Sequence, residues 1–306
     1  IFTEWLAQAD QHGLSHLKDH IKFTTYLSLT KQDLDYDVVY LDECHSLLYT
    51  HEPWLNSYKN KIIGLSGTPP RFKSSEKGKM VDSFCPIVYT YKTVAAVEDK
   101  ILNDYRIIVH LLQLETAKTL KVETRGKVWF TSEKDSYDYW SKRLDDSNSK
   151  KEEQIMRVMR MKALMSFTSK EKAAQKLLNN AKEKVILFAN TQEQADSFGV
   201  PSYHSKNSES EQNLLDFKAG KINKLSCVLQ LNEGVNIPNL KEGIIMHAYG
   251  NERKSSQRIG RLLRLNPNDV ATIHILCYEN TVDEFWVKSA LEDFDENKIK
   301  YIYNGI

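Results

Sequence analysis

The chain has 306 residues, of which 41% are hydrophobic; this suits about two compact domains and excludes a chain that is disordered throughout. Its 42 Lys and Arg residues nearly balance 41 Asp and Glu residues, so a basic track for nucleic acid would have to come from local clustering. The four cysteines are widely spaced and no apolar run has membrane-spanning length, so we expect a cytoplasmic protein without a disulfide framework or a zinc knuckle.

Residues 1–100 predict part of an α/β layer. Apolar residues recur at helical spacing over residues 3–21, and residues 23–29 form a run of strand-favouring residues. Residues 37–41 and 61–66 are short apolar runs that end in polar residues, as buried parallel strands do. Ligands of open α/β sheets bind at the carboxyl ends of the strands, so the residues that follow these two runs are candidates for a site.

Residues 101–150 are interpreted as a connecting or inserted segment. Residues 106–114 predict a strand that leads out of the first layer, and residues 115–150 are polar with interspersed aromatic residues. Residues 152–182 predict helix and contain four of the six methionines, which indicates packing rather than function.

Residues 151–306 predict a second α/β layer, because apolar runs alternate with helical patterns. The expected strands are residues 185–189, 224–231, 243–247 and 271–277. The expected helices are residues 192–198, 255–263 and 282–294. The fold class that we expect is therefore α/β with parallel sheets.

Two short motifs follow the apolar runs of the first layer. In Asp-Glu-Cys-His, Asp42 and Glu43 place two carboxylates at a sheet edge, where one could hold a hydrated Mg²⁺ and the other could orient or deprotonate a water. In Ser-Gly-Thr-Pro-Pro, Ser66 and Thr68 bring two hydroxyls to the end of the next run. Each motif alone is weak, because acidic strand ends and Gly-Pro turns are common.

The third motif, Gln-Arg-Ile-Gly-Arg-Leu-Leu-Arg at residues 257–264, is the most specific. Arg261 and Arg264 are three residues apart and would share one face of a helix, where two guanidinium groups can bind phosphate oxygens bidentately. Gly260 would cost the helix about 1 kcal/mol relative to Ala, which indicates that something approaches closely there. A solvated basic helix face is the alternative interpretation.

Five segments in chain order resemble motifs II to VI of superfamily-two helicases: DECH (42–45), SGT (66–68), VILFANT (185–191), LNEGVNIP (231–238) and QRIGRLLR (257–264). The resemblance spans about residues 20–290, and residues 72–180 are poorly covered. It implies two RecA-like parallel-sheet domains with an ATP cleft between them. Residues 1–100 would be the C-terminal part of the first, incomplete domain, and residues 151–306 would be the second. DECH and GVNIP favour the phage-type and restriction-type DNA translocases over the DEAD-box RNA helicases.

The resemblance also implies a role for each matching residue. Asp42 would hold Mg²⁺ and Glu43 would activate the attacking water, while Arg261 and Arg264 would stabilise charge on the transferred phosphoryl group. Gly234 and Asn236 would lie near the ribose and phosphates, Gln257 would sense nucleotide, and His45, Ser66 and Thr68 would couple the ATP site to the second domain and the strand. Thr25, Ser28, Thr191, His204 and Asn232 would contact the nucleic-acid backbone without reading its sequence. Position 236 is Asn where many relatives carry Asp, which leaves the ribose contact open.

The sequence also departs from the family in one larger respect, since no Gly-x-x-x-x-Gly-Lys-[Ser/Thr] loop occurs in the 306 residues. That loop binds phosphates and Mg²⁺ in such motors and lies upstream of the acid pair in relatives. Because only 41 residues precede Asp42, we expect an N-terminal truncation before the loop and little or no ATP turnover by this chain alone.

The leading hypothesis is an ATP-dependent helicase or translocase that uses ATP and Mg²⁺ on nucleic acid, with DNA favoured over RNA. Two alternatives stay open. One is a nucleic-acid-binding or regulatory module that has lost ATP hydrolysis, and the other is the motor part of a restriction enzyme. A zinc site at His12, His16 and His20, spaced four residues apart, is a further possibility, but a solvated histidine stripe is favoured.

Overall fold

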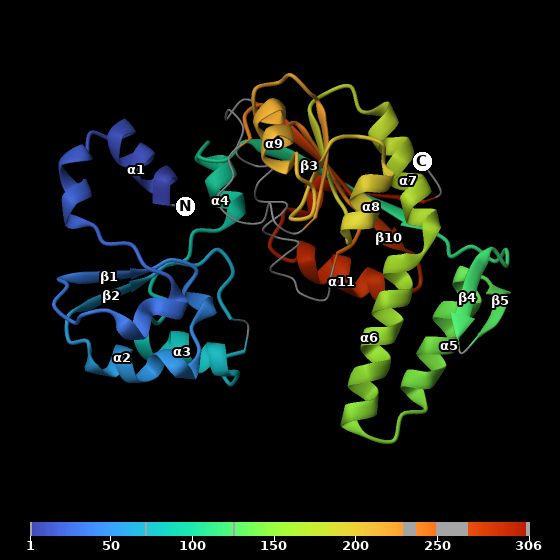
Figure 1. Cartoon of the computed structure of the whole chain (residues 1–306), viewed down its shortest axis with the longest axis horizontal. Helices are drawn as coiled ribbons and strands as arrows, with labels where there is room; N and C mark the ends of the chain where they lie inside the picture. The colour runs from blue at the N-terminus through green and yellow to red at the C-terminus, as the bar shows by residue number, and fades with distance from the viewer. Residues whose placement is uncertain (1, 71, 125, 229–236, 249–268, 304–306) are drawn as a thin grey trace. The chain divides into compact units, whose positions relative to one another are not determined.

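Figure 1 shows the protein as a computed structural model, which describes residues 2–70, 72–124, 126–228, 237–248 and 269–303. The chain divides into two compact units, residues 1–91 and residues 92–306, and each is described by itself. Among the helices in the described ranges, none is both long and apolar enough to cross a membrane.

The first unit is built around two short parallel strands. Its elements are α1 (Phe2–Gln11), η1 (Ser15–His20), η2 (Tyr26–Lys31), β1 (Val38–Leu41), η3 (Cys44–Ser46), η4 (Tyr49–His51), α2 (Glu52–Ser57), β2 (Lys61–Gly64) and α3 (Glu76–Phe84). Leu41 of β1 is paired with Gly64 of β2, so both strands end at the same sheet edge. The strands predicted at residues 37–41 and 61–66 are thereby confirmed.

Two other predictions for this unit are wrong. The helix expected over residues 3–21 ends at Gln11, because Gly13 adopts a left-handed backbone (φ +71°) and a separate 3₁₀ helix follows. The strand expected at residues 23–29 is instead the 3₁₀ helix η2. Leu29 is buried and Tyr26 packs against the same core, and their spacing of three residues matches one 3₁₀ turn.

The second unit contains a seven-stranded sheet in the order β11-β3-β10-β9-β6-β8-β7, in which all pairings are parallel. Its strands are β3 (Asp104–Leu112), β6 (Val185–Phe188), β7 (Ser202–Tyr203), β8 (Lys224–Cys227), β9 (Glu242–Ile245), β10 (Val270–Tyr278) and β11 (Ile299–Tyr303). Its helices are α4 (Thr93–Glu98), α5 (Glu133–Asp145), α6 (Lys150–Ser166), α7 (Thr168–Asn180), α8 (Gln192–Ser197), α9 (Ser210–Lys218), α11 (Val282–Leu291) and η6 (Glu296–Lys298). The α/β fold class is confirmed.

Helices cover both faces of this sheet, as the alternating burial of its central strand shows. Val185 and Leu187 of β6 pack with apolar residues of α7 and α8, whereas Ile186 and Phe188 pack with residues of α9 and α11. All four side chains are at most 1% exposed. A strand buried on both faces needs a continuous apolar run, which explains why this run was recognisable in the sequence.

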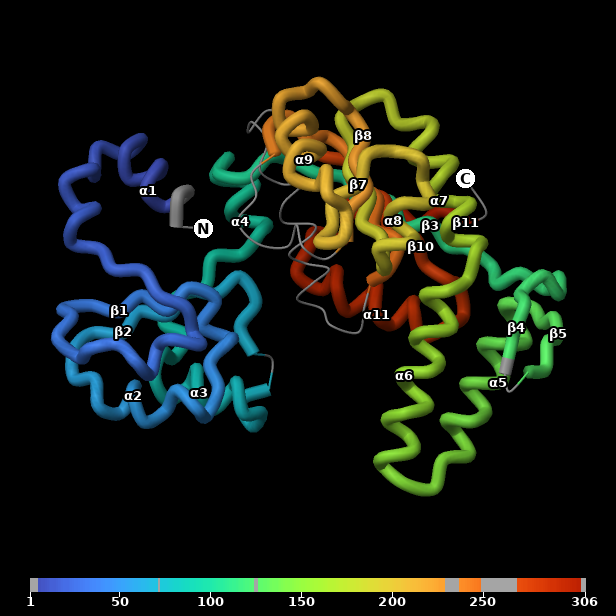
Figure 2. Tube along the Cα trace, viewed as in Figure 1, coloured from blue at the N-terminus to red at the C-terminus, as the bar shows by residue number. Residues whose placement is uncertain are grey.

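The strand at β3 has a different place from the one that the sequence suggested. It lies between β10 and β11 in the sheet of the second unit and does not lead out of the first layer. In Figure 2, β3 runs beside β10 and β11, although β3 is far from both of these strands in the sequence. Ile107 and Val109 are fully buried there. An apolar run predicts a buried strand but does not indicate which strands pair with it. The sheet to which β3 belongs could therefore not be predicted from the sequence.

Most other predicted elements of this unit are confirmed with small shifts. The strands expected at residues 185–189, 243–247 and 271–277 correspond to β6, β9 and β10, and the one expected at residues 224–231 is present as β8. The helices expected at residues 192–198 and 282–294 correspond to α8 and α11. The helix expected over residues 152–182 is interrupted at Phe167, which is 1% exposed. The helix expected at residues 255–263 lies outside the described residues.

The segment between β3 and α7 forms an arm on the second unit. The hairpin of β4 (Leu120–Thr124) and β5 (Lys127–Thr131) is antiparallel, and helices α5 and α6 pair with each other (Figure 1). Next to this arm, a buried ion pair joins α7 to α11. The ammonium of Lys170 in α7 forms an ion pair with Asp283 in α11, and both side chains are at most 2% exposed. Asp283 also accepts the backbone N–H of Tyr278 at 2.9 Å, so the buried charge is hydrogen-bonded as well as paired.

A histidine pair, with His110 buried and His274 half-buried, is expected to make the stability of this sheet depend on pH. The rings of His110 and His274 stack across β3 and β10, with Nε2 and Nδ1 2.9 Å apart. Burial lowers the pKa of both imidazoles to about 4.

We therefore expect the free energy of unfolding to fall as the pH drops from 6.5 towards 4. In that window the histidines of the unfolded chain, with a pKa of about 6.5, bind protons, whereas the folded pair stays neutral. Each unit by which a pKa is lowered in the folded protein corresponds to about 1.4 kcal/mol of unfolding free energy. Urea unfolding of the wild type, His274→Asn and the exposed control His16→Asn at several pH values measures this. The decline should be shallower in His274→Asn only; equal declines in all three proteins would contradict the assignment.

Candidate functional site

The acid pair lies at the carboxyl end of β1, as its position after the apolar run predicted. Asp42 is exposed, and its Oδ1 accepts the backbone N–H of Glu43 at 3.1 Å. Glu43 has a left-handed backbone (φ +50°), which is uncommon for a residue other than glycine and turns the chain sharply out of the strand. The Glu43 carboxylate oxygen Oε2 is 3.2 Å from Nδ1 of His45. The two carboxylates therefore have different surroundings, one facing water and one held by a neighbouring ring.

His45 connects the acid pair to the second motif. Its ring is 8% exposed, and Nδ1 lies 2.8 Å from Oγ of Ser66, which follows β2. The same Ser66 oxygen accepts the backbone N–H of Thr68 at 3.1 Å. The backbone closes the arrangement, because the N–H of Cys44 donates to the carbonyl of Leu65 at 2.9 Å. The structure thus brings together DECH and SGT, which are separated by about twenty residues in the chain.

One oxygen at this edge has no protein partner among the described residues. The Thr68 hydroxyl is buried but accepts or donates no hydrogen bond there. The described residues also hold no group of three side chains that could cage a metal ion. Mg²⁺ typically binds through one or two carboxylates together with substrate phosphates and water. The exposed Asp42 carboxylate is therefore of the kind that could hold a Mg²⁺ arriving with phosphates.

Behind the acid pair, β2 approaches two thiols closely. A Cβ atom added to Gly64 would lie 2.7 Å from Sγ of Cys85 and 3.0 Å from Sγ of Cys44. The thiol of Cys85 lowers the pKa of Cys44, while contact with Cys44 and burial raise the pKa of Cys85. Only glycine fits between this strand end and the thiols.

We expect Gly64→Ala to destabilise the protein by about 1–3 kcal/mol, the usual cost of overpacking. Gly67→Ala is the matched control, because an added Cβ there meets no atom within 4 Å. Chemical denaturation monitored by circular dichroism compares the two variants with the wild type. Equal unfolding free energies for the two variants would contradict this expectation and show that the thiols move to accommodate the added methyl group.

The two residues expected to touch nucleic acid in the first unit lie at the start of η2, with Thr25 directly before it and Ser28 within it. Thr25 is exposed, Ser28 is half-buried, and the N–H of Ser28 donates to the carbonyl of Thr25 at 2.9 Å. Tyr26 lies between them and donates its hydroxyl to the carbonyl of Asp42 at 2.6 Å. Burial raises the pKa of Tyr26, so this hydroxyl stays protonated as a donor. One hydrogen bond therefore links the predicted strand contacts to the acid pair.

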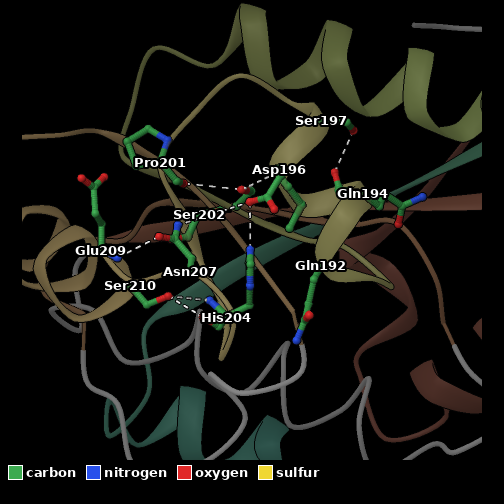
Figure 3. Close-up of polar contacts among 12 residues, drawn as sticks. Gln192, Gln194, Asp196, Ser197, Pro201, Ser202, His204, Asn207, Glu209 and Ser210 are labelled. Carbon is green, nitrogen blue, oxygen red and sulfur yellow. Dashed lines mark hydrogen bonds and ion pairs between the residues drawn. The ribbon is translucent and has the colours of Figure 1, made fainter.

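The second unit has a polar cluster at the carboxyl ends of β6 and β7 (Figure 3). Thr191 caps α8 by accepting the N–H of Gln194 at 3.1 Å. His204 is 2% exposed, and its Nε2 lies 2.8 Å from Oδ1 of Asp196, which also accepts the Ser202 hydroxyl at 2.6 Å. The bonds from His204 and Ser202 lower the pKa of the Asp196 carboxyl. The buried His204 ring thus helps to hold this loop in shape, and its contact with nucleic acid stays a prediction.

A pocket of about 320 Å³ opens beside this cluster. Its lining residues are Gln192, Glu193, Asp196, His204, Lys206, Asn207 and Ser208. Lys206 is exposed and brings a cation to the pocket. Sequence reasoning missed Lys206 and Asp196. The run Tyr-His-Ser-Lys-Asn, which follows a short strand, was the available signal for the lysine.

The remaining predicted site residues lie outside the described residues. They are Asn232, Gly234, Asn236, Gln257, Arg261 and Arg264. The structure therefore brings together the acid pair with the Ser-Gly-Thr motif. Separately, it joins the helix that Thr191 caps to the loop of His204, because the Gln192 amide donates to the Ser205 hydroxyl at 3.0 Å.

Comparisons with known proteins agree with this architecture. Residues 169–266 match the helicase conserved C-terminal domain. The DNA 3'-5' translocase XPB2 of Sulfurisphaera tokodaii is 25% identical over 246 residues, which cover 70% of this chain and 52% of that protein. This chain thus spans about half the length of that relative.

Two solved structures share the fold at low sequence identity. The ATP-dependent Type ISP restriction-modification enzyme LlaBIII bound to DNA has a TM-score of 0.58 at 15% identity, covering 92% of this chain and 23% of that one. A fragment of a putative HsdR subunit of a type I restriction enzyme from Vibrio vulnificus YJ016 has a TM-score of 0.57 at 17% identity, covering 91% of this chain and 50% of that one.

Proposed function

We propose that the chain, whose residues 169–266 match the helicase conserved C-terminal domain, is part of an ATP-dependent nucleic-acid helicase or translocase of superfamily two that acts on DNA. The observation that carries this proposal is the acid pair at the end of a parallel strand. Oε2 of Glu43 lies 3.2 Å from Nδ1 of His45, and the same nitrogen lies 2.8 Å from the Ser66 hydroxyl at the end of the neighbouring strand. The proposal of DNA over RNA draws on the relative described as a DNA translocase.

In this proposal the first unit is the C-terminal part of the first RecA-like domain and the second unit is the second such domain. ATP and Mg²⁺ would supply the phosphoryl group and neutralise its charge. Asp42 would hold Mg²⁺ through water, and Glu43 would accept a proton from the attacking water. Because His45 restrains the Glu43 carboxylate, this base is held in one place instead of sampling many rotamers.

The second unit would contribute the groups that bind nucleotide. Arg261 and Arg264 would stabilise negative charge on the phosphoryl group, Gln257 would sense the nucleotide, and Gly234 and Asn236 would lie near ribose and phosphates. These assignments rest on the motif resemblance alone.

Nucleic-acid contacts are proposed on both units. Thr25 and Ser28 would bond backbone phosphates from the first unit, and the Tyr26–Asp42 hydrogen bond gives these contacts a short route to the acid pair. On the second unit, Thr191 and Asn232 would contact the strand, and Lys206 would attract a phosphate to the pocket beside His204. His204 would act by fixing the loop, since its ring is buried.

We expect Glu43→Gln to lower strand-stimulated ATP hydrolysis at least about 100-fold, the usual range for removing a general base. Strand binding should remain, because Glu43 lies at the acid pair and not at the proposed strand contacts. ATP hydrolysis with and without single-stranded DNA is measured on this chain and on the longest reading frame that contains it. Glu52→Gln, an exposed carboxylate on α2, is the matched control. An unchanged rate in Glu43→Gln would remove Glu43 from the chemistry.

Arg264→Ala is expected to lower hydrolysis by about 10³-fold or more, as loss of an arginine finger does, while strand affinity changes little. The same assay measures the rate, and equilibrium binding of labelled DNA measures the affinity. Strand binding without stimulated hydrolysis in every length of the wild type would instead support a binding or regulatory module.

A further inference from the structure

The β4–β5 hairpin exposes large apolar side chains that the proposed motor chemistry does not use. Along β5, Val128 is 50% exposed, Trp129 is 46% exposed and Phe130 is 59% exposed. Single exposed apolar residues are ordinary, but three in succession on a short strand are not. Such a strand calls for a partner that covers it.

Each face of the hairpin carries one aromatic ring and one lysine. Phe130 stands directly across from Lys121, so these two side chains share a face. Trp129 stands across from Val122, and Lys127 lies on the Trp129 face because side chains two apart on a strand point the same way. A ring beside a cation suits a nucleotide, whose base is flat and whose phosphate is negative.

The charge of the hairpin favours a polyanion. Between residues 116 and 131 the described charged residues are Lys118, Lys121, Lys127 and Glu123. Glu123 lies 3.7 Å from Lys121, but both side chains are more than 60% exposed, and an exposed pair of this kind contributes little. The surface is therefore basic as well as aromatic, which disfavours a purely apolar occupant.

The hairpin is held firmly at its base. Glu133, which follows β5, is fully buried and accepts hydrogen bonds from the N–H of Glu115 at 3.1 Å and from the N–H and hydroxyl of Ser169 at 2.9 and 2.6 Å. The N–H of Lys134 donates to the carbonyl of Glu115 at 3.1 Å, which closes the base of the hairpin. Ser169 belongs to α7, so the hairpin is anchored to the second unit's core and its exposed rings need little ordering on binding.

We propose that the β4–β5 hairpin, residues 120–131, is a second contact for single-stranded nucleic acid. Trp129 and Phe130 lie on opposite faces, so a strand that passes around the edge of β5 stacks one base on each ring, while Lys121 and Lys127, one on each face, pair with phosphates. Stacking on an aromatic ring accepts every base, so this contact is independent of sequence. The inference rests on the proposed function for its ligand, but none of its residues belongs to the ATP chemistry.

The test is equilibrium binding of a fluorescein-labelled oligothymidylate of about 20 nucleotides to this chain, followed by anisotropy. Trp129→Ala and Phe130→Ala should each raise the Kd about fivefold or more, the lower limit for the loss of one stacked base. Trp129→Phe keeps a ring and should bind within about twofold of the wild type. Tyr303→Ala is the matched control, because Tyr303 is a 64% exposed aromatic on the edge strand β11.

A second readout separates stacking from a general loss of structure. The double substitution Lys121→Gln with Lys127→Gln should reduce the slope of log Kd against log salt by about one to two. Each phosphate contact that is lost lowers the number of counterions released when the strand binds. Thermal melting of every variant should match the wild type, since the side chains are exposed.

Three outcomes would overturn the proposal. An unchanged Kd in the Trp129→Ala/Phe130→Ala double variant, with normal wild-type binding, would exclude the hairpin as a nucleic-acid contact and leave the proposed motor function unaffected. Absence of oligothymidylate binding by the wild-type chain would contradict both the hairpin contact and the proposed nucleic-acid function. Light scattering that shows a wild-type dimer, lost in the double variant without a change in Kd, assigns β5 to contact between copies of the chain.

Discussion

Parallel strand pairing is the constraint on which the other features of this protein depend. Parallel neighbouring strands end at the same sheet edge, so the polar residues that follow each strand lie close together. In the first unit this brings Glu43 and His45 after β1 to Ser66 after β2. In the second unit it brings Gln192, at the start of α8 after β6, within hydrogen-bonding distance of Ser205 in the loop that follows β7. Each unit thus presents a polar edge above an apolar sheet.

A second organising feature is the buried polar joint that fastens the arm to the sheet. Ser169 bonds Glu133 at the base of the hairpin and also lies 2.7 Å from the Tyr278 hydroxyl at the end of β10. The next residue, Lys170, pairs with Asp283. Two consecutive residues of α7 therefore hold both the insertion and the end of a central strand. Buried polar groups that are fully hydrogen-bonded fix one arrangement, because any other would leave a charge or a donor unpaired.

The parts predicted from sequence were those with a local physical signature. β6 was recognisable because a strand buried on both faces needs an unbroken apolar run, and β1, β2 and β10 were recognisable from similar short apolar runs, although β1 and β2 are only partly buried. The sheet to which β3 belongs was not, since its partners are far along the chain. The identity of Asp42, Glu43 and Ser66 was readable from motifs, but the His45 bridge and the burial of His204 against Asp196 depend on tertiary contacts. The exposure of the β5 rings was also unpredictable, because an apolar run such as residues 128–130 is equally typical of a covered strand.

The position of β3 has a consequence for how the protein is made. His110 on β3 and His274 on β10 are separated by 164 positions in the sequence, yet they are in contact. A ribosome releases the chain from the amino end, so β3 leaves the exit tunnel long before either neighbour exists. Until β10 and β11 are synthesised, the apolar β3 must wait unpaired, exposed to chaperones and to other nascent chains. Closure of this sheet is thus a late event in biosynthesis, and premature termination before β10 would leave an aggregation-prone product.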